Sequence, residues 1–184
     1  MSWNADYGHS VVEFSARHMM LAKTRGQFEK FTVTVDADEA NPANSSVEVQ
    51  IDAASLNTRD ANRDGHLKSP DFLDVAKYPY ITFKSTGLNL SSQKNATLQG
   101  VLTIRDVTKP VTLEVEYHGQ SKSPWGTTNA GFTASTKISR SDWELTWNVA
   151  LETGGVLVSD EITINIELEL VKQAVTAPAE EVAA

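Results

Sequence analysis

Cysteine is absent from the 184 residues of this chain. Its absence excludes disulfides, thiolate metal ligands and cysteine nucleophiles. Positive charge is scarce, because 16 lysines and arginines stand against 24 aspartates and glutamates and give a formal net charge of -8. A protein this acidic repels the phosphate backbone, so we expect no nucleic-acid partner.

Long hydrophobic runs are also missing. No stretch approaches the roughly 20 apolar residues of a membrane-spanning helix, and the start Met1-Ser2-Trp3-Asn4 has no basic segment followed by an apolar one. We expect a cytoplasmic protein, or a periplasmic one if a leader has been removed. The sequence has no glycine-rich phosphate-binding motif and no GxSxG nucleophile motif, so neither a cofactor nor a catalytic role is expected.

The dominant pattern is strict alternation of apolar and polar residues, which is typical of β-strands with one buried face. The clearest run places Ile162, Ile164 and Ile166 on one face and Thr163 and Asn165 on the other. Eight runs of this kind occur, at residues 12–18, 31–35, 47–51, 81–83, 98–104, 111–117, 130–138 and 162–170. A turn is expected at 23–26 and a polar loop at 119–128.

The segment 55–79 interrupts the alternation and is too long for a plain hairpin loop. Ser69-Pro70-Asp71 is typical of a helix start, since serine caps, proline suits the first turn and aspartate favours the positive end of the dipole. We therefore expect a short helix carrying Phe72 and Leu73, and a polar lid, between the third and fourth strands. Residues 1–170 are predicted to form one domain and 171–184 a disordered tail.

Eight one-sided strands need a partner for every apolar face, and a closed barrel and a sandwich both provide one. A barrel also removes exposed strand edges. With eight strands its interior is either filled by side chains or wide enough for one small ligand. The strand pattern alone allows both architectures.

The four histidines, His9, His18, His66 and His118, match no zinc-binding spacing, so no metal site is expected. His9 and His118 are expected in exposed loops. His18 falls on the apolar face of its strand, two residues beyond Ala16. It is there either as a hydrogen-bonded core residue or as a polar contact at the mouth of a hollow barrel.

Two further groups of residues each allow two interpretations. Arg63-Asp64-Gly65-His66 forms either a lid held by an Arg63–Asp64 ion pair, a pairing that Arg59-Asp60 repeats, or a contact for a ligand head group. Aromatic residues and methionines on the strand faces form either a plain core or the lining of a tunnel for a flexible chain. These residues are Phe14, Phe28, Phe31, Phe72, Phe83, Phe132, Met19 and Met20.

Several short motifs, in order and at matching spacing, resemble the YceI-like family of lipid-binding proteins over roughly residues 3 to 170. The resemblance starts with Trp3-x-x-Asp6-x-x-His9-Ser10-x-Val12-x-Phe14-x-x-x-His18 and Gly26-x-Phe28. It continues through Asp52-x-x-Ser55-Leu56-x-Thr58, Arg63-Asp64-x-His66-Leu67, Asp71-Phe72-Leu73-Asp74-Val75-x-Lys77-Tyr78-Pro79, Ile81-x-Phe83, Gly100-x-Leu102-Thr103-Ile104-Arg105, Lys109-Pro110-Val111 and Arg140-x-Asp142.

The resemblance implies an all-β, lipocalin-like, eight-stranded antiparallel barrel that holds a polyisoprenoid lipid, such as an isoprenoid quinone or a prenyl pyrophosphate, for storage or transport. It also implies a homodimer. We further expect that the protein contacts membranes transiently and is not an enzyme. On this basis the expected ligand-binding residues are Phe14, His18, Met19, Phe28, Phe31, Arg63, His66, Phe72, Phe83 and Phe132. The alternatives are a ligand-free interaction or stress-response module, and a small-lipid hydrolase or isomerase using His18, Asp64 and His66.

The chain departs from the family pattern at two positions. The turn that usually reads Arg-Gly-Val-Thr is Arg105-Asp106-Val107-Thr108 here, and we expect the hairpin to survive because aspartate tolerates left-handed backbone geometry. The aromatic-glycine pair that follows Arg140-x-Asp142 in the family is Trp143-Glu144. Neither change predicts a new activity.

Overall fold

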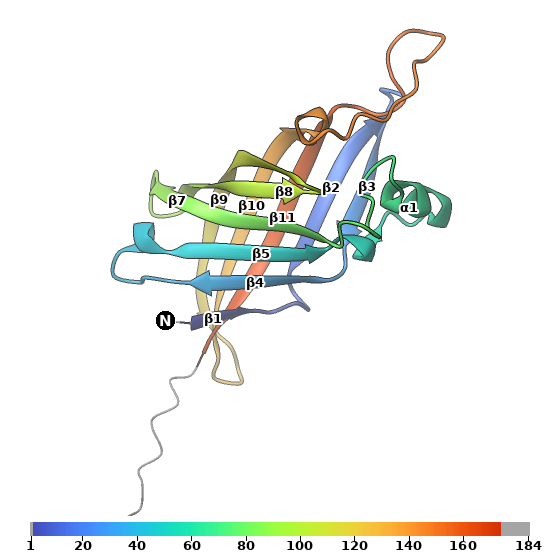
Figure 1. The fold of residues 1–184 in the computed structure, drawn as a ribbon. Helices are drawn as coiled ribbons and strands as arrows, with labels where there is room; N and C mark the ends of the chain where they lie inside the picture. Colours follow the sequence, from blue (N-terminus) through green and yellow to red (C-terminus); the bar gives the residue numbers. More distant parts are fainter. Residues whose placement is uncertain (1, 174–184) are drawn as a thin grey trace, which may run out of the picture.

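A computed structural model describes residues 2–173, which form one antiparallel sheet that closes on itself (Figure 1). Closure depends on β1 (Ser2–Ala5), which pairs with β4 (Phe31–Asp36) on one side and with the end of β11 (Glu161–Lys172) on the other. The ring runs β1-β4-β5-β7-β8-β9-β10-β11 and back to β1. The remaining members are β5 (Ser46–Asp52), β7 (Tyr80–Leu90), β8 (Asn95–Ile104), β9 (Val107–Lys122) and β10 (Thr128–Ser139). The predicted eight-stranded barrel is confirmed, and the sandwich is excluded.

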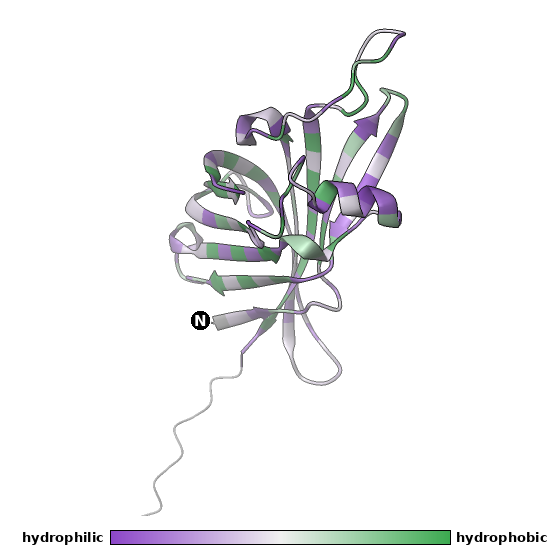
Figure 2. Cartoon of the chain, turned by 45° about the vertical axis from the view of Figure 1, so that its right-hand side comes forward, coloured by the Kyte–Doolittle hydropathy of each residue, from purple (hydrophilic) through white to green (hydrophobic). Residues whose placement is uncertain are grey.

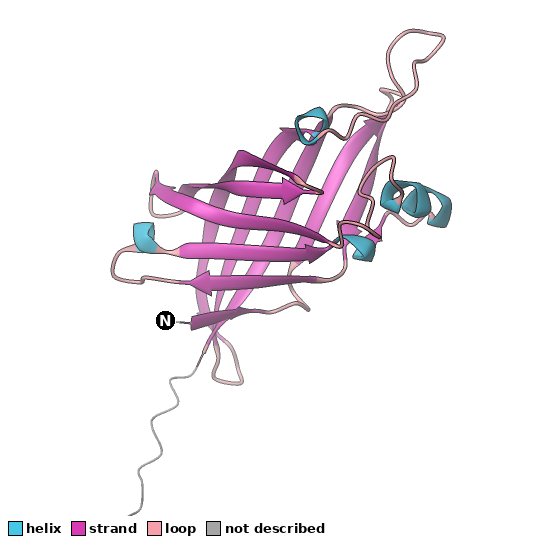
Figure 3. Ribbon diagram, viewed as in Figure 1, coloured by secondary structure: helices cyan, strands magenta, loops and turns pink. Residues whose placement is uncertain are grey.

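Three more strands extend one end of the barrel. β2 (Val11–His18) pairs with β11 along the same edge as β1, and it carries β3 (Ala22–Phe28) and the short β6 (Leu56–Asn57). Figure 3 shows the helical segments outside the sheet, at the barrel ends. They are α1 (Ala61–Lys68) and the 3-10 turns η1 (Pro42–Asn44), η2 (Ala53–Ser55) and η3 (Arg140–Trp143).

Alternation explains why these strands form a barrel. In β11 the isoleucines at 162, 164 and 166 point inward while Thr163 and Asn165 point outward. Figure 2 shows the same banding along the other long strands. All eight predicted runs lie in strands, because each gives the closed sheet one dry face.

The predicted turn at 23–26 is wrong, since these residues lie inside β3. The inner face of β3 carries Ala22, Thr24 and Gly26 before Phe28 at its end, so only one large apolar residue marks this face and no alternation reveals the strand. The turn itself lies at residues 19–21. Gly26 is needed because the Phe14 ring packs over it: a Cβ at residue 26 would lie 2.4 Å from Phe14 Cζ.

The expected helix is present between the third and fourth predicted strands, but it begins earlier than predicted. α1 starts after Asp60, whose carboxylate accepts a hydrogen bond from the Arg63 backbone N–H at 3.0 Å, and this bond lowers the pKa of the Asp60 carboxyl. Ser69 ends the helix instead of starting it, and Pro70 follows in a turn. Phe72 therefore extends from a loop and not from a helix face.

Three predicted boundaries also change. The 105–106 hairpin survives as expected, but Arg105 and not Asp106 adopts the positive φ, at 56°. The loop expected at 119–128 is shorter, because β9 runs to Lys122 and β10 begins at Thr128, so His118 is exposed on a strand. β11 continues to Lys172, and residues 174–184 of the predicted tail lie outside the described residues.

The densest packing lies at two places. The main cluster surrounds Trp143, which is 2% exposed and donates its indole N–H to the Leu102 carbonyl at 3.0 Å. A second cluster joins Trp3, Ala130 and Leu170 where β1 closes the ring. Within residues 2–173, no helix has the length and apolar character needed to cross a membrane.

Candidate functional site

The barrel encloses a cavity of about 1160 Å³ whose lining is mainly apolar. Because every long strand alternates, each one contributes a row of inward aliphatic or aromatic side chains. Examples are Val111, Leu113 and Val115 on β9, and Ile164, Ile166 and Leu168 on β11. Pockets for small-molecule ligands occupy about 300–1,000 Å³, so this interior is large enough for a sizeable ligand.

All six phenylalanines predicted to contact a ligand line this cavity: Phe14, Phe28, Phe31, Phe72, Phe83 and Phe132. They come from β2, β3, β4, β7, β10 and the loop after α1. The Phe14 and Phe28 rings lie 5.4 Å apart between centroids, and Phe132 lies 5.2 Å from Tyr117. The structure thus brings together side chains that are far apart in the sequence.

Met19 is the exception among the predicted ligand-binding residues. It lies in the turn between β2 and β3, is 42% exposed, and is not among the residues that line the cavity. Its φ of 51° directs the chain back toward β3. Met19 is therefore left out of the ligand contacts proposed below.

Polar side chains gather at the end of the cavity where β2 terminates. His18, Arg63 and His66 all line this end, and His18 is exposed at the rim, where its backbone pairs with Val158. Asp71 Oδ2 accepts a hydrogen bond from His66 Nε2 at 2.9 Å. The His66 ring also makes edge contacts with Phe72 and Trp147, at 5.1 and 4.5 Å between ring centroids.

The prediction of an Arg63–Asp64 ion pair is wrong. Both side chains bind Thr58 instead: Arg63 donates through Nε to the Thr58 hydroxyl and through Nη2 to its carbonyl, each at 2.8 Å. Asp64 accepts the Thr58 backbone N–H at 2.9 Å. The Arg59–Asp60 pair is likewise not formed in the described chain, because Asp60 caps α1. Thr58, which is buried, is therefore the residue that fixes the lid.

Sequence reasoning missed two residues that shape this end. Trp147 lines the cavity from a segment without periodicity, so no pattern indicated it. Arg140 is 5% exposed, and its guanidinium binds the carbonyls of Leu145 at 2.6 Å and Trp147 at 2.9 Å through Nη1. Nε and Nη2 bind the carbonyls of Ser159 at 2.9 Å and Val158 at 3.3 Å. Arg140 thus fastens the loop from 145 to 159 over the cavity.

The opposite end of the cavity has different polar groups. Asp38, Glu39, Gln93 and Lys94 line it, and Glu39 pairs with Lys172 at 2.7 Å. One end therefore carries an arginine and two histidines, while at the other two carboxylates are balanced by Lys94 and Lys172. The middle contains only hydrocarbon and aromatic surface apart from a few hydroxyls.

The residues proposed for acid-base chemistry do not form a catalytic group. Asp64 is bound to Thr58 and His66 to Asp71, and no hydrogen bond joins His18, Asp64 and His66 within residues 2–173. General acid-base catalysis needs partners within about 2.6–3.2 Å. The arrangement therefore gives no support to the hydrolase or isomerase alternative.

One group of potential metal ligands lies outside the cavity. Asp6, His9 and Glu169 offer ligand atoms within 4.8 Å of one another. His9 Nδ1 lies 3.0 Å from Asp6 Oδ2, and this hydrogen bond raises the pKa of His9 and lowers that of Asp6. The group joins the bend between β1 and β2 to β11.

The closed sheet and its enclosed apolar space define the class of lipocalin-like barrels. The chain belongs to the YceI-like family, because the model of the YceI-like domain matches residues 3–170. Protein YceI of Escherichia coli O157:H7 is 40% identical over 165 residues, which cover 90% of this chain and 83% of that protein.

Solved structures show the same architecture. BcnA of Burkholderia cenocepacia matches with a TM-score of 0.77 and 26% identity, over 90% of this chain and 99% of that one. A polyisoprenoid binding domain from Saccharophagus degradans, implicated in plant cell wall breakdown, matches with a TM-score of 0.67 over 93% of this chain and 98% of that one. At 14% identity, the second likeness shows the fold alone.

Proposed function

We propose that this protein binds a long polyisoprenoid lipid inside the barrel and stores or transports it. The carrying observation is the cavity of about 1160 Å³, lined along its length by inward apolar side chains. Membership of the YceI-like family supports a binding role over an enzymatic one. The domain from Saccharophagus degradans with the same fold binds polyisoprenoids according to its description, which agrees with this ligand class.

Burial of hydrocarbon supplies the affinity in this proposal. Each buried CH₂ contributes about 0.8 kcal/mol, so a chain of many isoprene units binds well with few polar contacts. The strand faces provide such surface: Phe83, Leu98 and Ile164 come from three different strands and all line the cavity. A filled barrel acting only as an interaction module is disfavoured by the same cavity.

The polar groups at the two ends orient the lipid. His18, Arg63 and His66 form a polar end suited to a quinone carbonyl or a pyrophosphate, whereas at the other end Glu39 is already paired with Lys172. We therefore place the head group beside His18 and the hydrocarbon tail toward β5 and β8. Replacing His18 with Leu tests this placement, because the head group loses a hydrogen-bond partner at the polar end and lipid uptake should weaken.

Native mass spectrometry before and after organic extraction tests the proposal. The purified protein should carry a lipid mass that extraction removes, and the extracted protein should take up one member of a panel of prenyl quinones and prenyl pyrophosphates. The variant Ala134→Phe, which adds a ring inside the cavity, should lose this uptake. The matched control Ser135→Phe adds the same volume on the outer face of β10 and should keep it. Uptake of none of the panel would refute the proposal.

The homodimer implied by the family is part of the same proposal. Sedimentation velocity measures it directly, and a mass near twice the 20.1 kDa of one chain is the expected result. A monomer at all accessible concentrations would remove the dimer from the proposal and leave lipid binding untouched.

A further inference from the structure

Exposed apolar side chains cluster at one end of the molecule. Nine large apolar side chains are exposed in residues 2–173, and five of them lie in the β2–β3 turn and the adjacent 149–156 loop. We call these five residues the apolar tip: Met19 at 42% exposed, Met20 at 63%, Leu21 at 79%, Val149 at 47% and Val156 at 38%. Figure 1 shows the loop, in orange, projecting beside the end of the β2–β3 hairpin.

The two halves of the apolar tip form one surface. The Met19 backbone N–H donates to the Leu157 carbonyl at 2.8 Å, and Ala150 pairs with Val156 across the loop. The side chain of Met20 lies against Gly155, where a Cβ would come 2.7 Å from its sulfur. The exposed methionines are therefore held in place against the loop.

The β2–β3 turn has methionines at positions where the backbone geometry favours glycine or asparagine. Met19 and Met20 both have positive φ, at 51° and 61°, a geometry that hairpins usually assign to Asn-Gly or Gly-Gly. A Met-Met pair here is strained and also exposes hydrocarbon to water. Strain and exposure that bring no gain in folding occur mainly at functional sites.

Unpaired cations lie directly behind the apolar tip. Arg17, which also borders the cavity, and Lys23 lie opposite each other across β2 and β3, and Arg25 lies two residues further along β3 on the same face as Lys23. All three are exposed, and none forms an ion pair in the part of the chain that the structure describes. Like charges opposite each other destabilise a hairpin. This basic patch is notable in a chain whose net charge is -8.

The apolar tip also adjoins the mouth of the cavity. His18 precedes Met19 in the sequence, and the Leu157 carbonyl accepts the Met19 backbone N–H. Both His18 and Leu157 line the cavity. A lipid leaving the cavity at this end therefore meets the apolar tip first. A surface with exposed hydrocarbon at its edge and cations behind it is complementary to the interface of a bilayer with anionic lipids.

We propose that the apolar tip docks the protein on a membrane that contains anionic phospholipid, with the cavity mouth facing the bilayer. This inference rests on the proposed lipid cargo, because it assigns the surface through which that cargo passes. Met20 and Leu21 insert among the head groups, and Lys23 and Arg25 contact lipid phosphates. The carboxylate of Glu152, which is exposed in the same loop, repels anionic lipid and lowers the affinity for the membrane.

Flotation with lipid vesicles tests the docking surface in the full chain. The probes are vesicles of phosphatidylcholine alone and vesicles with a quarter phosphatidylglycerol. The wild type should bind the anionic vesicles more tightly, and added salt should weaken that binding. Met20→Gly with Leu21→Ser removes two exposed apolar side chains and gives the turn a glycine at positive φ, so it should fold and bind at least tenfold more weakly. Lys23→Gln with Arg25→Gln should weaken binding to anionic vesicles by roughly fivefold per cation removed.

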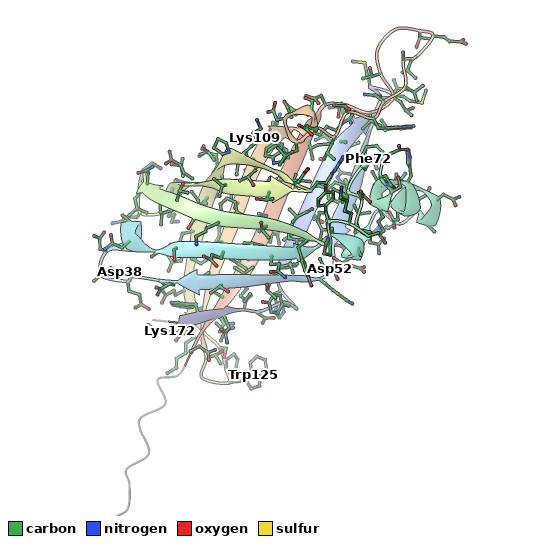
Figure 4. All side chains as sticks on the ribbon, viewed as in Figure 1. Asp38, Asp52, Phe72, Lys109, Trp125 and Lys172 are labelled. Carbon is green, nitrogen blue, oxygen red and sulfur yellow. The ribbon has the colours of Figure 1, made fainter. Side chains whose placement is uncertain are left out.

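A matched control comes from the opposite end of the molecule. Trp125 is 88% exposed in the β9–β10 turn, and Figure 4 places it far from the apolar tip. Trp125→Ser should leave vesicle binding unchanged. Loss of binding in this variant, with none in Met20→Gly/Leu21→Ser, would overturn the proposal. A tip variant that turns a dimer into a monomer while still binding vesicles would overturn it too, since the tip would then hold a second copy.

The failure of docking and the failure of the cargo proposal give different results. Uptake of a prenyl lipid from detergent, measured without vesicles, reports only on the cavity. A wild type that takes up lipid from detergent but binds no vesicles refutes the docking surface alone. A wild type that binds vesicles through the apolar tip but takes up no lipid refutes the cargo.

Discussion

Arg140 shows how one residue holds the lid of the cavity. Its guanidinium is buried and binds four backbone carbonyls, two on each side of the loop that carries Val149 and Val156 of the apolar tip. The carbonyls of Leu145 and Trp147 have no strand partner to replace it, since residues 144–149 lie outside the sheet, whereas the Val158 carbonyl also accepts from Asn148 Nδ2 at 2.8 Å. Burial lowers the pKa of Arg140, and the nearby Asp160 opposes that change. The charge persists because arginine stays protonated in proteins.

Replacing Arg140 with Met should destabilise the protein by about 3 kcal/mol, because several buried carbonyls lose their donor at once. Urea unfolding followed by circular dichroism measures the change. Arg59→Met is the control, as Arg59 is exposed and its side chain forms no ion pair in residues 2–173. Equal stability of the two variants would contradict the role given to Arg140.

Glu144 occupies a backbone position that favours glycine. It ends η3 with φ 61° and ψ 23°, at the position where the family pattern has glycine. Glu144→Gly should therefore stabilise the protein by about 1 kcal/mol. Glu144→Ala removes the carboxylate without relieving the backbone, so it should give no such gain. A thermal melt of both variants checks the difference, and an equal gain from alanine would assign the effect to charge.

His9 and Asp6 make a prediction about pH. The hydrogen bond to Asp6 raises the pKa of His9 above 6.5, and the same bond lowers the pKa of Asp6 below 3.8. His9, whose pKa is raised, stabilises the fold below pH 6.5 and loses this effect as the pH rises through its folded pKa. Asp6, whose pKa is lowered, stabilises the fold above pH 3.8 and loses this effect as the pH falls through its folded pKa. The hydrogen bond between the two side chains therefore stabilises the fold most strongly between pH 3.8 and pH 6.5.

An NMR titration of the His9 ring tests this coupling. The wild-type pKa should lie above 6.5, and Asp6→Asn should bring it back toward that value. Asp38→Asn, which removes a carboxylate from a different loop, should leave the His9 pKa unchanged. A His9 pKa that does not respond to Asp6→Asn would show that the hydrogen bond is not formed in solution.

Among the elements, β3 is one that the sequence concealed. Most of its inner face is small, and Gly26 gives space to the Phe14 ring and to the buried Thr58. The predicted helix start at Ser69 failed for a related reason: Asp60 supplies an equally good cap, and only the contacts of Arg63 and Asp64 with Thr58 favour the earlier start. Local signals of similar strength are decided by tertiary contacts that the sequence does not reveal.

Two glycine substitutions test the packing of β3 and the stability of α1 separately. Gly26→Ala should destabilise the protein by about 1–3 kcal/mol, because the new methyl group meets Phe14 at 2.4 Å and Thr58 Cγ2 at 2.8 Å. Gly65→Ala lies in α1 with no atom within 4 Å and should stabilise it by about 0.5–1 kcal/mol. Urea denaturation measures both. A neutral Gly26→Ala would show that Phe14 moves freely into the cavity.

At the scale of the whole molecule, most of the strands could be predicted, but the hollow could not. Alternation identified eight of the eleven strands, since each of these has one dry face, and it missed β1, β3 and β6. The same alternation is satisfied by a filled interior, so Phe83 and Phe132 were compatible with either a core or a tunnel. The expectation of a cavity came from the resemblance to the YceI-like family. The volume of the cavity depends on the distances between strands across the closed sheet, which the alternation of residues does not reveal.

The central claim is that the barrel interior holds a polyisoprenoid chain. A crystal structure of the purified protein incubated with a prenyl quinone tests it most directly. We predict continuous electron density through the cavity, with the head group beside His18 and Arg63 and the tail along Phe83 and Leu98. An interior that contains only separate water peaks, with the quinone absent or bound on the outer surface, would contradict the account.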